Sequence, residues 1–263
     1  MSSVERYLAR IGFDAHVGAP SVELLAALQL AHLVHVPFEN LHPFHRRGVR
    51  TDVEWSYPKI VEQRRGGWCF ELNGAFGALL RGLGFDTDYV SCQVWESDVT
   101  DWGPPHDHLG LLVRLGGQRW FVDVGFGDCC IQPLLVEEGP RPAVPRAALV
   151  SVEAAAFVLT ELAAPTADRP ATWEPQLKVS LAPTQLAVFD RRSRYLQTEP
   201  GLSWTEKPFA TRALDATGSR VTLRMDVLRH RRGTGGFVDA AVAPAAWSDV
   251  LRDQFGIDDR NAR

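Results

Sequence analysis

The sequence predicts a protein of the α+β class, and two observations support this prediction. Apolar residues recur at helical spacing through residues 1–83, whereas short runs rich in β-branched and aromatic residues begin after Phe85. The chain has 263 residues, of which 45% are hydrophobic, and this is enough for a large core. We therefore expect a mostly helical part over residues 1–83, a strand-rich part over residues 84–190 and a C-terminal part over residues 191–263.

Composition and charge argue against several classes of partner. The formal net charge of −4 disfavours a nucleic-acid-binding protein, which carries an excess of basic residues on one face. The N-terminus lacks the pattern of a secretory signal, and no apolar run is long enough to span a bilayer. The basic cluster at residues 229–232 (RHRR) is typical of a solvated surface or turn. We expect no nucleic-acid partner and no membrane partner.

The four cysteines indicate a reducing compartment. Cys69, Cys92, Cys129 and Cys130 show no paired CxxC spacing, and two of them are adjacent. This pattern predicts neither a disulfide framework nor a zinc site. We expect a cytoplasmic protein with no bound metal and no resident cofactor.

Helical spacing and turn residues locate the elements of the first part. The helices expected before Cys69 cover residues 4–12, 21–33 and 53–63, the second with Ser21 as its N-cap. Pro37 ends the second helix, and residues 37–41 (PFENL) are expected to form a turn that carries the carboxylate of Glu39.

The rest of the chain reads as strands, loops and one final helix. Strands are expected at residues 88–95, 108–115, 118–124, 155–160, 173–179, 188–189, 209–214 and 220–227. Loops are expected at residues 96–105 and 139–147, a connector at about 190–205, and a helix at 244–255 that begins with Pro244. The middle strands would complete a small antiparallel barrel.

Cys69 lies between a glycine pair and an amphipathic helix, within residues 64–73 (RRGGWCFELN). From Leu72 onward, apolar residues fall on one helical face until Gly82 and Gly84 end the pattern. Cys69 is thus expected in the first turn, where unpaired backbone N–H groups favour a thiolate over a thiol. We interpret Cys69 as a nucleophile; the alternative is a small buried hydrophobe, as most free cysteines are.

A predicted β-hairpin places a histidine beside an aspartate. The Gly-Gly pair at residues 116–117 joins two β-rich runs and has the composition of a two-residue turn. The register of that turn places Asp123 opposite Gly110 and makes His108 its diagonal neighbour on the same face. This predicts a hydrogen bond between His108 and Asp123, which a slip of one residue would abolish.

Cys69, His108 and Asp123 together offer a nucleophile, a base and a group that orients the base. A cysteine at a helix start, followed by histidine and aspartate on adjacent strands, is the arrangement of papain-like and transglutaminase-like enzymes. The alternative is that His108 only closes a strand and Asp123 only caps a turn. The three residues in these settings favour the catalytic interpretation.

The sequence resembles the arylamine N-acetyltransferases over most of its length. The motifs that carry the resemblance are residues 7–12 (YLARIG), 36–41 (VPFENL), 64–73 (RRGGWCFELN), 108–109 (HL) and 122–127 (VDVGFG). The resemblance implies a papain-like cysteine-triad architecture with an N-terminal helical bundle, a central β-barrel and a C-terminal α/β lid. It also assigns the family's acyl-accepting cysteine, histidine and aspartate to Cys69, His108 and Asp123.

The resemblance implies a ping-pong reaction in which acetyl-CoA acetylates Cys69 and the acetyl group passes to an aromatic amine, hydrazine or N-hydroxyarylamine. Acetyl-CoA is then a substrate and not a bound cofactor. An amide synthase of the same fold with another acyl donor is one alternative, and a papain-like or transglutaminase-like hydrolase is the other. The sequence leaves open whether the protein is a monomer or a homo-oligomer.

The resemblance also implies roles around the cysteine. Phe126 is expected to line the acyl and amine pocket and Gly127 to lie near the pantetheine of CoA. Glu39 and Arg65 are expected to form a polar brace near Cys69. Residues 200–204 (PGLSW) correspond to a Pro-x-Ser-x-Phe-like element by the CoA cleft, which places Ser203 and Trp204 there, with Trp204 where phenylalanine is common.

Overall fold

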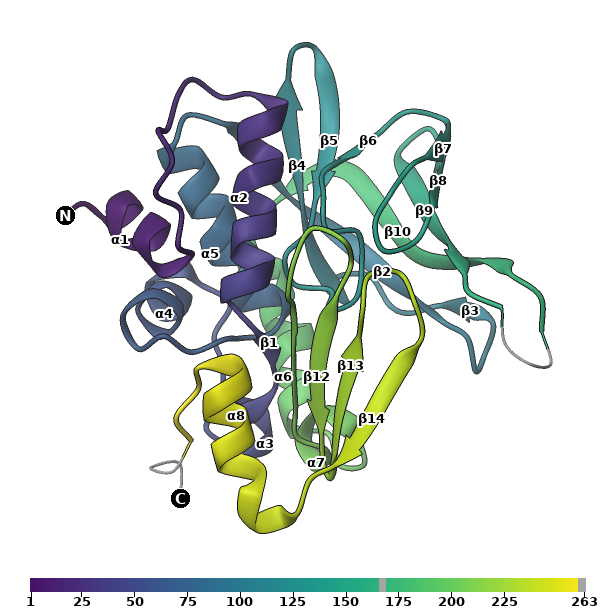
Figure 1. Ribbon diagram of the computed structural model, residues 1–263. Coiled ribbons are helices and arrows are strands. Elements are labelled where there is room, and N and C mark those ends of the chain that lie inside the picture. The colour runs from purple at the N-terminus through teal and green to yellow at the C-terminus, as the bar shows by residue number, and fades with distance from the viewer. Residues whose placement is uncertain (166–168, 260–263) are drawn as a thin grey trace.

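The computed structural model describes residues 1–165 and 169–259 and combines helices, a curved sheet and a smaller sheet (Figure 1). The helices before the curved sheet are α1 (Ser3–Arg10), α2 (Val22–His35), α3 (Leu41–Phe44), α4 (Val53–Tyr57), a π-helical turn (Pro58–Glu62) and α5 (Cys69–Gly82). Ser21 caps α2, as predicted, and its side chain accepts a hydrogen bond from the Leu24 amide at 3.1 Å. The α+β class is therefore confirmed.

The curved sheet is antiparallel throughout and nearly closes into a barrel. Its strands are β2 (Asp86–Glu96), β3 (Asp101–Trp102), β4 (His108–Leu115), β5 (Gln118–Val122), β6 (Leu134–Leu135), β7 (Gly139–Arg141), β8 (Ala148–Val152), β9 (Ala156–Ala163) and β10 (Thr172–Thr184). Their order is β6-β5-β4-β2-β10-β9-β8-β7, with β3 paired to β2. Arg141 on one edge donates to the Leu135 carbonyl on the other at 3.3 Å, so the two edges meet.

The smaller sheet forms most of the lid. It consists of β1 (Phe38–Glu39), β11 (Phe209–Ala213), β12 (Arg220–Arg224), β13 (Val227–Arg231) and β14 (Phe237–Ala241), in the order β1-β11-β12-β13-β14. The helices α6 (Asp190–Thr198), α7 (Ser203–Glu206) and α8 (Trp247–Phe255) accompany it. Because β1 comes from the helical part, this sheet ties the lid to the segment that precedes Cys69.

Helix α5 is the packing centre of the molecule. It lies behind α2 in Figure 1 and next to the curved sheet. Its buried Phe70, Leu72 and Phe76 share one core with Leu109 and Leu111 of β4. This packing sets the distance between the start of α5 and the hairpin that carries His108.

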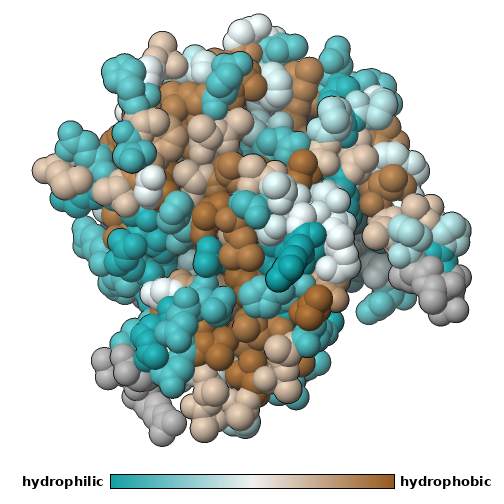
Figure 2. Space-filling model, in the orientation of Figure 1, coloured by the Kyte–Doolittle hydropathy of each residue, from teal (hydrophilic) through white to brown (hydrophobic). Residues whose placement is uncertain are grey.

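In the described residues, no helix is both long and apolar enough to cross a membrane. Apolar and polar side chains alternate over the face shown in Figure 2, and apolar side chains reach the surface over the lid strands. Phe237 and Val238 of β14 are among the exposed apolar residues.

Several predicted loops are wrong because they contain short strands or helices. The turn at 37–41 includes strand β1, which pairs with β11. The loops at 96–105 and 139–147 include β3 and β7, and the connector at 190–205 forms α6 and α7. A two- or three-residue strand has no recognisable period, so only its tertiary partner defines it.

Three further predictions about the second half are wrong. Residues 188–189 are not a strand but the end of a 3₁₀ turn (Leu186–Phe189), because the Phe189 ring packs on Phe70 at 5.6 Å. The run at 220–227 is two strands, β12 and β13, separated by a turn with Met225 at φ 39°. Residues 229–232 lie largely in β13, where Arg231 is buried against Asp128 and not solvated.

Candidate active site

The start of α5 is held by hydrogen bonds that place Cys69 as the first helical residue. Trp68 is the N-cap, and its amide donates to the Glu71 carboxylate at 3.2 Å. A Cβ on Gly67 would lie 2.7 Å from that carboxylate, and one on Gly66 would lie 2.2 Å from the Pro37 carbonyl. The glycine pair is thus required by close packing at this turn.

His108 and Asp123 meet as the hairpin register predicts. Leu115 pairs with Gln118, and the His108 Nε2 atom lies 2.6 Å from the Asp123 Oδ2 atom. Both side chains are buried, with 2% and 4% of their surface exposed. The imidazole is therefore held in one orientation by a buried carboxylate.

Asn73 fixes that carboxylate relative to α5. Its Nδ2 atom donates to the Asp123 Oδ1 atom at 2.8 Å and to the Leu109 carbonyl at 2.6 Å. Its Oδ1 atom accepts from the Val124 amide at 2.9 Å. Sequence reasoning missed Asn73, although its position one helical turn after Cys69 was a usable signal.

The electrostatics of the site favour a charged imidazole. Burial lowers the pKa of His108, but the Asp123 carboxylate and the sulfur of Cys69 outweigh burial and raise that pKa to about 10. Cys69 is itself buried, with 9% exposure, at the first position of α5. A buried imidazolium between a carboxylate and a sulfur is the charge arrangement of an activated cysteine.

The predicted polar brace involves a third residue that sequence reasoning missed. Glu39 lies 3.8 Å from the Lys59 ammonium, which binds both Glu71 oxygens at 2.8 and 2.9 Å. Arg65 instead approaches Asp259 at 3.5 Å. Burial raises the pKa of Glu39, but the charges of Lys59 and Arg65 outweigh it and lower that pKa. Lys59 thus links Glu39 to Glu71, the residue whose carboxylate accepts from the N-cap amide of α5. No spacing in the sequence indicated this link.

Phe126 and Gly127 lie at one end of a cleft, where Phe126 contacts His108. The Phe126 ring packs edge-on against His108 with centroids 5.2 Å apart. Both residues line a cavity of about 270 Å³ that Phe38, Trp204 and the lid strands β11–β13 also enclose. Gly127 has φ 90°, a conformation that favours glycine.

Ser203 and Trp204 lie at the other end of this cleft. They line a second cavity of about 470 Å³, which shares Trp204 with the first. The Trp204 ring contacts Trp68, the neighbour of Cys69, with centroids 6.0 Å apart. The structure therefore brings Phe126, Gly127, Ser203 and Trp204 to one continuous groove.

Known proteins resemble this chain in sequence. A family model for N-acetyltransferase matches residues 21–262. The arylamine N-acetyltransferase of Mycolicibacterium smegmatis is 30% identical over 264 residues, which cover 96% of this chain and 90% of that protein. The enzyme of that name from Escherichia coli (strain K12) is 40% identical over 124 residues, 47% of this chain and 43% of that protein. This second match spans less than half the length of that relative.

Solved structures agree in fold over the whole chain. The arylamine N-acetyltransferase from Salmonella typhimurium superposes with a TM-score of 0.88 at 26% identity, covering 98% of this chain and 92% of that one. The Mycobacterium marinum enzyme, solved in complex with CoA, gives a TM-score of 0.86 at 26% identity and covers 99% and 94%. With the family model matching most of its length, this chain belongs to the arylamine N-acetyltransferase family.

Proposed function

We propose that this protein transfers an acetyl group from acetyl-CoA to an aromatic amine, hydrazine or N-hydroxyarylamine by way of an acetyl-Cys69 thioester. The observation that carries the proposal is the buried His108–Asp123 hydrogen bond of 2.6 Å, with Cys69 against the same imidazole at the start of α5. Family membership supports the choice of donor and acceptor, because the relatives and solved structures are named for that activity.

In the first half-reaction, the Cys69 thiolate attacks the thioester carbonyl of acetyl-CoA. The new carbon–sulfur bond forms a tetrahedral oxyanion, which then collapses with loss of the CoA thiolate. His108, protonated because of Asp123, gives its proton to the departing sulfur. The backbone N–H of Cys69, at the positive end of α5, is suited to stabilise the oxyanion.

In the second half-reaction, the amine nitrogen attacks the acetyl-Cys69 carbonyl. His108, now neutral, takes the proton that the nitrogen loses, and the Cys69 thiolate leaves as the amide forms. Asp123 and Asn73 act as positioning residues because they hold the imidazole through the 2.6 and 2.8 Å contacts. The cycle thus returns His108 to its charged state and Cys69 to the thiolate.

We expect the two ends of the cleft to bind different parts of the substrates. Phe126 and Gly127 would contact the acyl group and the amine, beside His108. Ser203 and Trp204 would contact CoA, whose phosphates would be attracted to Lys207 and Arg224 along the same cavity. Glu39 and Arg65 would act indirectly, as parts of the charged network around the start of α5. We also infer a reducing cytoplasm as the site of action, consistent with four free cysteines.

Mass spectrometry tests this proposal directly. The pure protein is incubated with acetyl-CoA alone, and we expect one acetyl group on Cys69 and one equivalent of free CoA. Addition of an arylamine should remove the acetyl group and give the N-acetyl product. An unmodified Cys69, or CoA release that continues without amine, would overturn the proposal, and the latter would indicate a hydrolase. Acylation only by a carrier-bound donor would indicate an amide synthase.

A further inference from the structure

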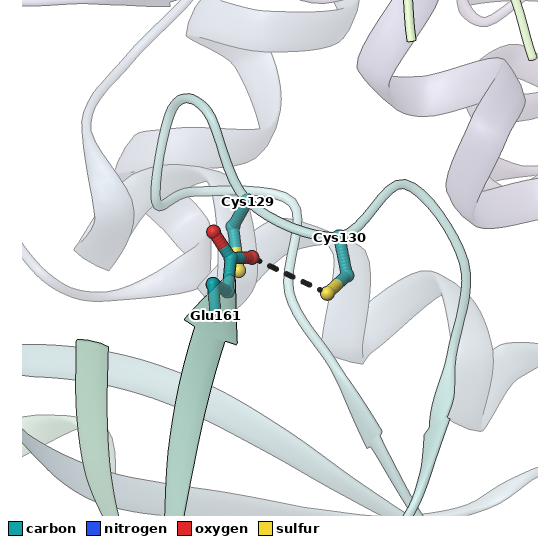
Figure 3. A group of neighbouring side chains, drawn as sticks. All are labelled: Cys129, Cys130 and Glu161. Atoms are coloured by element: carbon teal, nitrogen blue, oxygen red, sulfur yellow. Dashed lines mark hydrogen bonds between the residues drawn. The ribbon is translucent and has the colours of Figure 1, made fainter. Parts of the chain in front are cut away.

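Three potential metal ligands gather where the loop that follows Asp123 meets strand β9. Cys129 and Cys130 lie in that loop and point toward Glu161 on β9 (Figure 3). The three side chains are buried, with 6%, 4% and 1% exposure, and their ligand atoms all lie within 4.8 Å of one another. No other such group is found within residues 1–165 and 169–259.

Although the cysteine spacing alone predicts no zinc site, the approach of Glu161 changes that expectation, and we infer that Cys129, Cys130 and Glu161 form a binding site for a thiophilic divalent cation, with Zn²⁺ as the ion that the donor set fits. Two sulfur ligands exclude Mg²⁺ and Ca²⁺, which prefer oxygen, and sulfur with one carboxylate oxygen suits zinc. The site is separate from the proposed acyl transfer, which uses Cys69 and His108 and no metal.

The observed spacing agrees with zinc coordination. A tetrahedral zinc with bonds of about 2.3 Å to sulfur and about 2.1 Å to oxygen separates those two ligands by roughly 3.5 Å. The Cys130 Sγ atom and the Glu161 Oε1 atom are 3.4 Å apart. These two atoms are therefore already separated by about the distance that a tetrahedral zinc ion requires.

Arg146 orients the carboxylate and balances the charge. Its Nε atom donates to the Glu161 Oε2 atom at 2.6 Å, which leaves Oε1 directed at Cys130. Two thiolates and one carboxylate around Zn²⁺ would carry a net charge of −1, and the guanidinium of Arg146 cancels it. A hydrogen bond of this kind to a metal ligand is a common feature of zinc sites.

The site also has an entrance and room for a fourth ligand. Glu161 and Arg146 line a surface cavity of about 300 Å³, between the barrel and β14. Of the three proposed ligands only Glu161 lines this cavity, so in the proposed site the ion would enter past Glu161 and a water molecule from the cavity would be the fourth ligand.

Binding exchanges protons for the metal in a balanced step. As the two Zn–S bonds form, both thiol protons leave to solvent. Affinity should therefore rise with pH, as for other thiolate sites.

Metal retention in variants of the full-length protein tests the inference. Cys69→Ser is the parent, because Cys69 beside His108 is a second place where zinc could bind. After equilibration with Zn²⁺ and gel filtration, elemental analysis should find about one zinc per chain in this parent. The added change Cys129→Ala, Cys130→Ala or Glu161→Gln should weaken retention at least tenfold. Cys92→Ala, an equally buried free cysteine outside the cluster, should leave it unchanged.

Two further measurements use protein in which Cys129, Cys130 and Glu161 are unchanged, so they test the inference even if a variant misfolds. Co²⁺ added to the Cys69→Ser protein should produce a thiolate-to-cobalt charge-transfer band in the near ultraviolet, and Zn²⁺ should displace it. Zn²⁺ should also protect Cys129 and Cys130, but not Cys92, from alkylation during partial unfolding. The inference is overturned if the folded protein retains no zinc, or if zinc retention survives loss of both cysteines.

Discussion

His108 is charged in a buried setting because acceptors face it from two elements. Asp123 approaches its Nε2 atom, and Cys69 at the start of α5 interacts with the same ring. Without these partners burial would favour the neutral imidazole, so the charged form depends on the contacts of a few atoms. The proposed activity is thus most sensitive, at the scale of single residues, to the group that orients the imidazole.

Replacing the orienting carboxylate tests this dependence. Asp123→Asn keeps the shape of the side chain and removes its charge, so we expect acetyl transfer to fall by about 10³- to 10⁴-fold with the fold retained. Rapid-quench measurement of Cys69 acetylation and circular dichroism would check both parts. Asp98→Asn, in an exposed turn, is the matched control. Normal turnover in Asp123→Asn would remove Asp123 from the mechanism.

The same contact predicts how stability depends on pH. The pKa of His108 is raised from 6.5 to about 10 in the folded protein, so the folded state binds the proton more tightly than the unfolded state. The resulting stabilisation is fully present below about pH 6.5 and is lost as the pH rises to about 10. Urea unfolding across this range should show the loss in the wild type. In Asp123→Asn the loss of stability over this range should be much smaller. An equal loss in both proteins would show that Asp123 does not raise the pKa of His108.

At the scale of elements, the start of α5 is held by close backbone approach on one side and by buried charge on the other. The Asp123 loop comes so near to α5 that a Cβ on Gly125 would lie 2.7 Å from the Cys69 Cα atom. On the other side, Lys59 joins Glu71 of α5 to Glu39 of β1. The position of Cys69 relative to His108 is therefore decided jointly by three elements.

The close approach at Gly125 predicts a loss of activity. Gly125→Ala must push the loop away from α5, and a displacement of this size costs on the order of 10²-fold in rate when reacting groups lose alignment. We expect kcat/KM for arylamine acetylation to fall by that amount. Gly236→Ala, where a Cβ would meet nothing within 4 Å, should not change it. Equal activities of the two variants would show that the contact is unimportant.

The buried ammonium of Lys59 predicts a loss of stability. Lys59→Met leaves the carboxylates of Glu71 and Glu39 buried without their cation, which typically costs about 3–5 kcal/mol. Urea denaturation would measure this change. Lys178→Met is the control, because Lys178 pairs with Glu153 near the surface and such pairs contribute less than about 1 kcal/mol. Similar midpoints for the two variants would argue against a structural role for the network.

At the scale of the whole molecule, Asp128 joins the barrel to the lid. Its carboxylate accepts two hydrogen bonds from Arg231 of β13, at 2.6 and 2.8 Å, and lies 3.0 Å from Arg220 of β12. Arg146, from the loop before β8, approaches the same carboxylate at 3.1 Å. The lid sheet is thus anchored next to Gly127, at one wall of the cleft.

The charge of this junction predicts an acid-dependent stability. Burial raises the pKa of Asp128, but Arg231, Arg220 and Arg146 outweigh it and lower that pKa from 3.8 to about 2. The ionised carboxylate therefore contributes roughly 2 kcal/mol to the free energy of unfolding. This contribution is present above about pH 3.8 and is lost as the pH falls to about 2. Asp128→Asn should lose at least this amount at neutral pH in urea unfolding. Asp239→Asn, which breaks an exposed pair with Arg229, should change the free energy of unfolding much less.

Sequence reasoning succeeded where the governing interaction is local. The Gly-Gly turn defined the hairpin register and so the meeting of His108 with Asp123, because a two-residue turn leaves one alignment of its strands. Helical spacing placed Cys69 at a helix start for the same kind of reason. Sequence reasoning failed at β1 and at Phe189, where a partner far along the chain decides the conformation.

The sequence by itself determined the α+β class, the three residues of the candidate triad and the family, because these depend on periodicity, on turn geometry and on motifs read in order. Only the tertiary structure decided which charges surround the triad. Lys59 reaches Glu71 and Glu39, three arginines converge on Asp128, and Glu161 comes to Cys130 from 31 residues away. These contacts join segments that are far apart in the chain and form only when those segments pack together. Local residue spacing therefore does not predict them.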